Sequence, residues 1–516
     1  MAGWVSKLSA VLVACGLMQG CGAPPEEESS GELTSAGWEE TESPQALCPP
    51  DAASTQRMKA NLPPAEGGPP RGIPTPDSFV NVQGQLYFTA LGTSFGLTLW
   101  RSSGTPEGTV AVKTFPWMES LTPSSSRLFF QASDDAHGEE LWVSDGTPAG
   151  TQLLKDLTPG AASSSLVNMA ALGERLVFFR QVTDPNTSAT KSELWTSDGT
   201  ASGTVRLFSA LPEVVPPPAP RGWFGGPVPA EVLKLGGALL FITRNADGPA
   251  LWRTDGTKAG TVRLKDVGAA DTGAFSTLVS GGWAFFYVKG ADGKTAVWKS
   301  DGTSAGTQRL YTYAATLSPL MLGALGSSLY VTTTSSTTQR ITLRRIPLAG
   351  GSESAVVMLP NAYADQGSAY PHVTGVSAVK GGQQVYFAVT IDGERQAPRD
   401  AQLWGTDGTA AGTRMLHRPL SRSDEYTSPL YAAADNLVFF SADGESAQGG
   451  IEPWVTDGTP GGARLLKDLT PGRDSSYPYG FLRVGDRVFM ATADIIDGGQ
   501  VWATTLRTTC SASASP

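Results

Sequence analysis

Short apolar segments recur along most of the chain, and turns rich in Gly separate them. Five examples carry aromatic or β-branched residues: Leu86–Ala90, Leu128–Ala132, Leu239–Thr243, Val385–Val389 and Leu437–Ser441. Alternate side chains of a strand point to opposite faces, and both faces of these segments carry apolar groups. The pattern therefore predicts short strands that are buried between neighbouring sheets, and it leaves little material for long amphipathic helices.

A recurring phrase follows most of these segments. Its fullest copy reads Glu140-Leu-Trp-Val-Ser-Asp-Gly-Thr147, followed by a second Gly-Thr and a strand at Gln152–Lys155. Variants stand at Leu99–Thr109, Leu194–Thr204, Leu251–Thr261, Val297–Thr307, Leu403–Thr413 and Pro453–Ala463. Asp-Gly predicts a tight turn, because Gly accepts positive φ and Asp bonds the turn backbone. With one further strand upstream, such as Phe79–Val82, each unit is a repeated four-stranded antiparallel meander.

The number and ends of the units predict the architecture. Second strands begin near nine positions: Leu86, Leu128, Leu176, Leu239, Ala284, Leu329, Val385, Leu437 and Val488. The sixth unit has lost its Trp and Asp-Gly-Thr, and the ninth ends after Trp502 without a fourth strand. Gln56–Pro63 matches the fourth strand of the full copy and would complete the ninth unit. The sequence thus predicts an all-β protein, a β-propeller of about eight or nine four-stranded blades closed by an N-terminal strand. A linear solenoid of sheets is the alternative.

The N-terminus predicts export and lipidation. Lys7 precedes an apolar run, Leu8–Met18, that is too short to span a bilayer. The run ends at Gly20-Cys21-Gly22, which resembles a bacterial lipoprotein signal, so residues 1–20 are interpreted as the signal peptide and Cys21 as the lipidation site. Cys15 is an alternative site, and an ordinary cleaved signal is a second alternative. Gly22 is not Asp, which favours outer-membrane delivery over retention at the inner membrane.

The segments that flank the repeats predict a tether and a latch. Residues 21–47 carry seven Glu and no Lys or Arg, a composition that predicts a disordered acidic tether. The β-propeller is assigned to residues 48–510, with a tail at 511–516. Cys48 and Cys510 lie at the two ends of this body in an exported chain, which predicts a disulfide between them. Two free thiols are the alternative.

The phrase Glu140-Leu-Trp-x-x-Asp-Gly-Thr147 resembles the ELWxxDGT repeat family of bacterial proteins, some of which are called hyalin-like. The match runs from about Phe79 to Trp502. Five units keep both the Trp-x-x-Asp-Gly-Thr pattern and the later Gly-Thr: those at Trp142, Trp195, Trp252, Trp298 and Trp404. The resemblance implies an exported or surface-attached protein, and it implies no particular reaction.

Candidate chemistry is sparse. The three His residues lie in different stretches of the chain, so no nucleophile–base pair is indicated. Asp134, Asp135 and Glu139 are weak candidates for a calcium site, with a solvated turn as the alternative. No other cofactor is expected. The six repeated Asp residues are interpreted as turn caps, with calcium ligands as the alternative: Asp145, Asp198, Asp255, Asp301, Asp407 and Asp457.

One insertion departs from the repeat. Pro212–Pro227 is rich in Pro, and Trp223 and Phe224 lie within it. Adjacent exposed aromatics bind sugars or fill a partner's pocket, so these two residues are predicted to contact a partner. A loop that folds back over the sheet edge is the alternative.

Taken together, these features favour a lipid-anchored binding or adhesion module of the cell envelope. Its partner would be an extracellular or periplasmic protein or glycan, and the net charge of −10 disfavours nucleic acid. A polysaccharide hydrolase or lyase on the same scaffold and a structural envelope factor are the alternatives. No two of the 48 acidic residues stand out as a catalytic carboxylate pair.

Overall fold

A computed structural model describes residues 47–58, 77–91, 96–183, 190–211, 213–214, 232–245, 248–269, 273–361, 370–378, 383–392, 398–418, 430–434, 436–443, 450–472, 475–494 and 498–508. All of them belong to the second of the chain's two units, residues 35–516. Within these ranges the only helix is a short 3₁₀ turn at Ala52–Ser54. No helix in the described part of the chain has the length and apolar character needed to cross a membrane.

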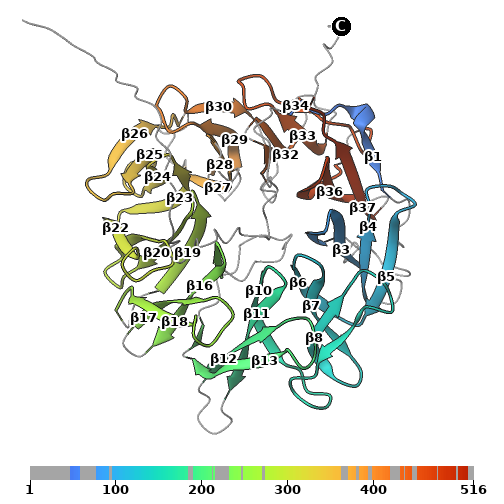
Figure 1. Ribbon diagram of the computed structural model, residues 1–516. Coiled ribbons are helices and arrows are strands. Elements are labelled where there is room, and N and C mark those ends of the chain that lie inside the picture. Colours follow the sequence, from blue (N-terminus) through green and yellow to red (C-terminus); the bar gives the residue numbers. More distant parts are fainter. Residues whose placement is uncertain are drawn as a thin grey trace, which may run out of the picture. The chain divides into compact units, whose positions relative to one another are not determined.

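The described strands form nine antiparallel blades, numbered here along the ring (Figure 1). Blades 1 to 3 consist of β2 (Asp77–Val82), β3 (Gln85–Leu91), β4 (Leu97–Ser102) and β5 (Thr109–Phe115); β6 (Met118–Pro123), β7 (Leu128–Asp134), β8 (Gly138–Ser144) and β9 (Gln152–Lys155); and β10 (Ser165–Leu172), β11 (Arg175–Thr183), β12 (Thr190–Ser197) and β13 (Val205–Leu211). Blades 4 to 6 consist of β15 (Leu233–Leu235), β16 (Ala238–Asn245), β17 (Gly248–Thr254) and β18 (Val262–Asp266); β19 (Gly273–Ser280), β20 (Trp283–Lys289), β21 (Thr295–Ser300) and β22 (Gln308–Tyr313); and β23 (Leu317–Leu325), β24 (Ser328–Ser335), β25 (Ile341–Pro347) and β26 (Ser354–Met358). Blades 7 to 9 consist of β27 (Tyr370–Ala378), β28 (Val385–Asp392), β29 (Pro398–Thr406) and β30 (Arg414–His417); β31 (Tyr431–Ala434), β32 (Leu437–Asp443), β33 (Ile451–Thr456) and β34 (Arg464–Leu465); and β35 (Tyr479–Val484), β36 (Arg487–Asp494), β37 (Gly498–Thr505) and β1 (Thr55–Arg57).

The blades close into a ring, which confirms the predicted β-propeller and contradicts the solenoid alternative. The first strand of each blade contacts the next blade all the way round, and β35 of blade 9 contacts β2 of blade 1. The N-terminal strand β1 pairs antiparallel with β37, with Thr55 opposite Thr504. This is the closure that the sequence predicts, although β1 begins one residue earlier and ends sooner than the predicted Gln56–Pro63 segment.

The core lies between blades. Trp142 of blade 2 is 5% exposed and packs edge-on against Phe115 of blade 1, with ring centroids 4.8 Å apart. Phe130, fully buried, lies in the same cluster. The fourth strand carries a bulge opposite the Leu-Trp pair, and in blade 2 the residue that the pairing skips is Leu154. This bulge points the side chain of Leu154, which is 5% exposed, toward the apolar side chains of blade 3.

Candidate functional site

The repeated Asp residues cap the loops in which they stand. Asp145 Oδ1 accepts hydrogen bonds from the backbone N of Thr147 at 2.8 Å and from its Oγ1 at 2.7 Å. Thr147 Oγ1 in turn accepts from the backbone N of Gly150 at 2.9 Å. The bond from the Thr147 side chain, together with that from its backbone N–H, holds the pKa of Asp145 below its usual range. The same Asp-to-Thr contacts recur at Asp198, Asp255, Asp301, Asp407 and Asp457.

The two glycines of the phrase are required by close contacts. Gly146 has a φ of +84°, and a Cβ there would lie 2.1 Å from the hydroxyl of Tyr87 in blade 1. A Cβ on Gly150 would lie 2.1 Å from Asp145 Oδ1. The first glycine therefore serves the packing between blades, and the second serves the loop itself.

A repeated lysine on the fourth strand also joins blades. Lys155 of blade 2 donates to the carbonyl oxygen of Thr204 in blade 3 at 2.7 Å, and its Nζ lies 5.9 Å from the ring centroid of Trp195. Lys113 makes the same pair of contacts one blade earlier, to Thr151 O and to the ring of Trp142. These lysines are thus committed to the scaffold, partly through cation–π contacts.

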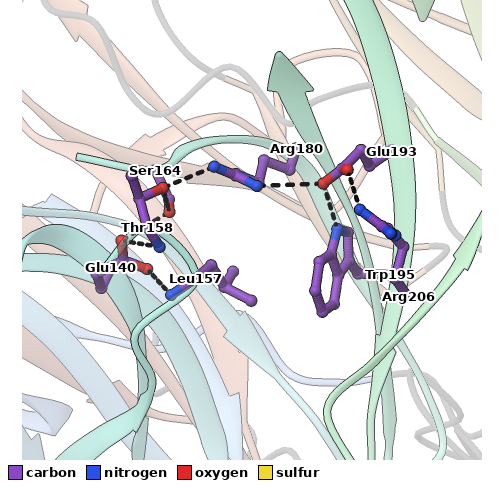
Figure 2. Close-up of polar contacts among 8 residues, drawn as sticks. All are labelled: Glu140, Leu157, Thr158, Ser164, Arg180, Glu193, Trp195 and Arg206. Atoms are coloured by element: carbon purple, nitrogen blue, oxygen red, sulfur yellow. Dashed lines mark hydrogen bonds and ion pairs between the residues drawn. The ribbon is translucent and has the colours of Figure 1, made fainter. Parts of the chain in front are cut away.

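The Glu of the full phrase supports the connection between blades 2 and 3 (Figure 2). Glu140 is fully buried and accepts from the backbone N–H groups of Leu157 at 2.9 Å and Thr158 at 3.2 Å, and from Ser164 Oγ at 2.6 Å. Burial raises the pKa of Glu140, and these donors oppose that rise. Because its oxygens are enclosed and occupied by protein donors, Glu140 is held as a loop support and lacks the access that a catalytic acid needs.

Blade 8 repeats this arrangement. Glu452 is 4% exposed and accepts from Leu469 N at 2.9 Å and Ser476 Oγ at 2.7 Å. The donors to Glu140 and to Glu452 lie at the same sequence offsets from their Glu, 17 residues for the Leu and 24 for the Ser. A group that recurs in two blades with the same partners is a scaffold element.

Glu193, at the equivalent position of blade 3, has different partners (Figure 2). It accepts from Arg206 Nη1 at 2.6 Å, from Arg180 Nη1 at 3.3 Å and from Trp195 Nε1 at 3.0 Å. Arg180 also donates through Nη2 to Thr158 Oγ1 at 2.7 Å, so it links blade 3 to the connection that Glu140 supports. The carboxylate is saturated by two guanidinium groups, an arrangement that fixes structure.

In the acidic loop predicted as a weak calcium site, Asp134 binds the neighbouring His137. Asp134 Oδ1 accepts from the backbone N of His137 at 2.7 Å, and His137 Nδ1 lies 2.9 Å from both Asp134 oxygens. The hydrogen bond to Asp134 raises the pKa of His137. Across the described residues, no three His, Cys, Asp or Glu side chains are grouped to hold a metal ion. The calcium prediction, which also named Asp135 and Glu139, gains no support from this loop.

The sixth blade replaces the repeat Trp by an ion pair. Arg344 stands opposite Val331, as Trp142 stands opposite Phe130. Its Nε donates to Thr333 Oγ1 at 2.8 Å, and its Nη1 donates to Glu353 Oε1 at 2.7 Å. The sequence shows the loss of the Trp but not the partner, because Glu353 stands at the register position that holds Thr151 in blade 2, where the repeat carries no charged residue.

The Pro-rich insertion interrupts the first strand of blade 4. A two-residue strand, β14 (Glu213–Val214), and β15 both pair with β16, on the edge that β17 leaves open. Val214 lies opposite Thr243, and Leu233 lies opposite Leu240. In blade 2 the corresponding stretch of β6 holds only a one-residue bulge. The insertion therefore enters and leaves the propeller at a bulge position of a first strand.

Several predicted site residues lie outside the described residues. These are the lipidation site Cys21, the insertion aromatics Trp223 and Phe224, and Cys510. Cys48 is described. Its backbone forms an isolated antiparallel β-bridge with that of Arg507, three residues before Cys510, in which Cys48 N donates to Arg507 O at 2.8 Å.

No family model matches the sequence. No curated protein matches it. Among solved structures, a prolyl endopeptidase is 10% identical over 75% of this chain and 55% of its own, with a TM-score of 0.40. Prolyl oligopeptidase B from Galerina marginata is 10% identical over 73% and 55%, with a TM-score of 0.40. The β-propeller domain of the Trilobed protease from Pyrococcus furiosus is 13% identical over 68% and 98%, with a TM-score of 0.33. This chain spans little more than half the length of the two peptidases.

Proposed function

We propose that the protein is a lipid-anchored binding module of the cell envelope that presents its propeller to a protein or glycan partner. The observation that carries this proposal is how the repeated polar residues are used. The Asp caps, the Lys bridges and the buried Glu140 and Glu452 all have partners within the scaffold. Recognition is therefore assigned to the parts of the chain that depart from the repeat.

The insertion at blade 4 is the largest such departure. Its two ends are fixed by pairing to β16, one at Val214 and the other at Leu233. Ends held on a rigid sheet lower the entropy lost when a loop binds. We assign the partner contact to Trp223 and Phe224 within this insertion, because paired aromatics supply much contact area for little ordering cost.

Lipid attachment at Cys21 would place this body at the outer membrane or the cell surface, tethered by the acidic segment up to residue 47. Labelling of cells with a fatty-acid analogue tests the anchor. Label on the wild type and on Cys15→Ala but not on Cys21→Ala is the expected result. Loss of label from Cys15→Ala alone would move the site to Cys15, and an unlabelled wild type would contradict lipidation.

Partner capture tests the binding function. The full chain is compared with a Trp223→Ala/Phe224→Ala variant on a panel of envelope proteins and polysaccharides. A matched control is Trp38→Ala, an aromatic substitution in the tether. We expect retention of one panel member by the wild type and the control, and its loss from the double variant. Release of shortened polysaccharide products by the wild type would overturn the binding proposal in favour of a hydrolase or lyase.

A further inference from the structure

We propose that residues 47–58, here called the strap, fasten the ring at three successive blades, and that release of the strap opens the ring at the junction of blades 9 and 1. The strap does more than add the strand β1. It contacts blade 8, completes blade 9 and reaches the seam with blade 1.

The first attachment is to blade 8. The side chain of Asn436 brackets Leu47: its Oδ1 accepts from Leu47 N at 3.2 Å, and its Nδ2 donates to Leu47 O at 2.9 Å. Arg464 on β34 donates through Nη2 to the carbonyl oxygen of Pro49 at 2.6 Å. Two side chains thus hold the start of the strap by its backbone, a recognition mode that depends little on strap sequence.

The second attachment completes blade 9. Thr55 is 2% exposed, pairs with Thr504 of β37 and donates to its Oγ1 at 3.0 Å. Lys467, which follows β34 of blade 8, donates to the carbonyl oxygen of Thr55 at 2.8 Å. The strap has therefore taken the place that a next blade's loop occupies for Lys113 and Lys155.

The third attachment lies in the seam between blades 9 and 1. Met58 is fully buried, and its backbone N donates to Val501 O in blade 9 at 2.8 Å. It belongs to a cluster that contains Phe88 and Trp100 of blade 1 and Phe489 of blade 9. This cluster lies where the C-terminal end of the repeats meets the first blade. Met58 therefore contributes a buried side chain to the junction that closes the ring.

Topology makes this junction the one that opens. Blades 1 to 8 each lead directly along the chain into the following blade, whereas β37 pairs with β1 and β35 contacts β2 across roughly 400 residues of sequence. Closing so long a loop carries an entropic cost that the strap contacts must offset. A pulling force applied to the chain before Leu47 would also reach the propeller through the strap.

Hydrogen exchange on the full chain tests the proposal. The variant Asn436→Ala/Arg464→Ala removes the side-chain hydrogen bonds of the first attachment and leaves β1 itself unchanged. Arg414→Ala is the matched control, because Arg414 is equally exposed at the equivalent position of blade 7. We expect amide exchange in β35–β37 and β2 to accelerate by about tenfold in the double variant, with β16–β18 of blade 4 unchanged.

A second variant separates strap release from general damage. Met58→Ala should accelerate the same strands, and an added peptide spanning residues 47–58 should slow exchange again in this variant, because the peptide supplies Met58 while Asn436 and Arg464 remain to bind it. Unchanged exchange in β35–β37, or equal acceleration in blade 4, would overturn the proposal.

Discussion

Arg487 of blade 9 donates through Nη1 to the carbonyl oxygen of Gly104 in blade 1 at 2.8 Å, across 383 residues of sequence. A Cβ on Gly104 would lie 1.9 Å from the same nitrogen, so the turn needs glycine there. Arg175 makes the equivalent contact to Gly256 O at 3.0 Å, between blades 3 and 4. The contact that stacks consecutive blades therefore also closes the ring.

Replacing Arg487 by Ala should lower the free energy of unfolding by about 1–2 kcal/mol, because it removes hydrogen bonds from a charged donor to two carbonyl groups. Arg175→Ala is the matched comparison at a junction that the chain itself connects. Urea unfolding followed by tryptophan fluorescence measures both. An Arg487→Ala variant as stable as the wild type would show that the closing contact contributes nothing.

The Asp caps predict a loss of stability in acid. The pKa values of Asp145 and Asp198 lie below their usual range in the folded protein, where hydrogen bonds from Thr147 and Thr200 favour the charged form. Their contribution is present above the unfolded pKa of about 3.9 and is lost as pH falls through the lower folded pKa. Urea unfolding between pH 6 and pH 2.5 should show this decline. An Asp145→Asn/Asp198→Asn variant should show a weaker one, and an equal pH dependence would contradict the role of these caps.

Glu140→Gln should destabilise the fold by about 1–3 kcal/mol, because the new amide nitrogen would face the donors that now point at a carboxylate oxygen. The neighbouring substitution Glu139→Gln is the control. The pKa of Glu140 is raised, so the sign of its pH effect is opposite to that of the Asp caps. Its contribution is greatest below its unfolded pKa and falls as pH rises through the folded one. Thermal unfolding of both variants from pH 4 to pH 8 measures the two effects, and equal stability of the two variants would argue against the loop-support role.

The ion pair of blade 6 predicts a non-additive mutant cycle. The Arg344 and Glu353 side chains are 20% and 14% exposed, so Arg344→Trp alone would leave a largely buried carboxylate without its cation and cost about 3 kcal/mol. Adding Glu353→Ala should recover much of that loss and restore the aromatic layer of the other blades. Unfolding free energies of the two single variants and the double variant give the coupling. Additive values would mean that the two side chains act independently.

The Cys48–Cys510 disulfide stays a prediction. The backbone β-bridge that places Cys48 beside Arg507, three residues before Cys510, supports it. Alkylation of the exported protein without prior reduction should leave both cysteines unmodified, and mass spectrometry after reduction should show both labelled. Reduction should also lower the melting temperature, because the bond joins the two ends of the ring. Alkylation of Cys48 in unreduced protein would contradict the bond.

The sequence alone determined the scaffold. The alternating apolar segments, the Trp and the Asp-Gly-Thr turns fix local structure through side-chain burial and backbone preference, and both act over a few residues. The missing fourth strand after Trp502 and the matching segment near Gln56 were enough to predict ring closure, because an unpaired blade edge needs a partner.

Only the tertiary structure decided which polar residues are available for function. Glu140 and Glu193 stand at equivalent places in the phrase, yet one supports a loop and the other binds two arginines, because their partners come from elsewhere in the chain. The three attachments of the strap depend on neighbours distant in sequence, whereas Arg344 on β25 and Glu353 just before β26 meet within one blade through the pairing of these two strands. Such contacts depend on strand pairing and on the packing of blades, so a repeat pattern read along the chain does not contain them.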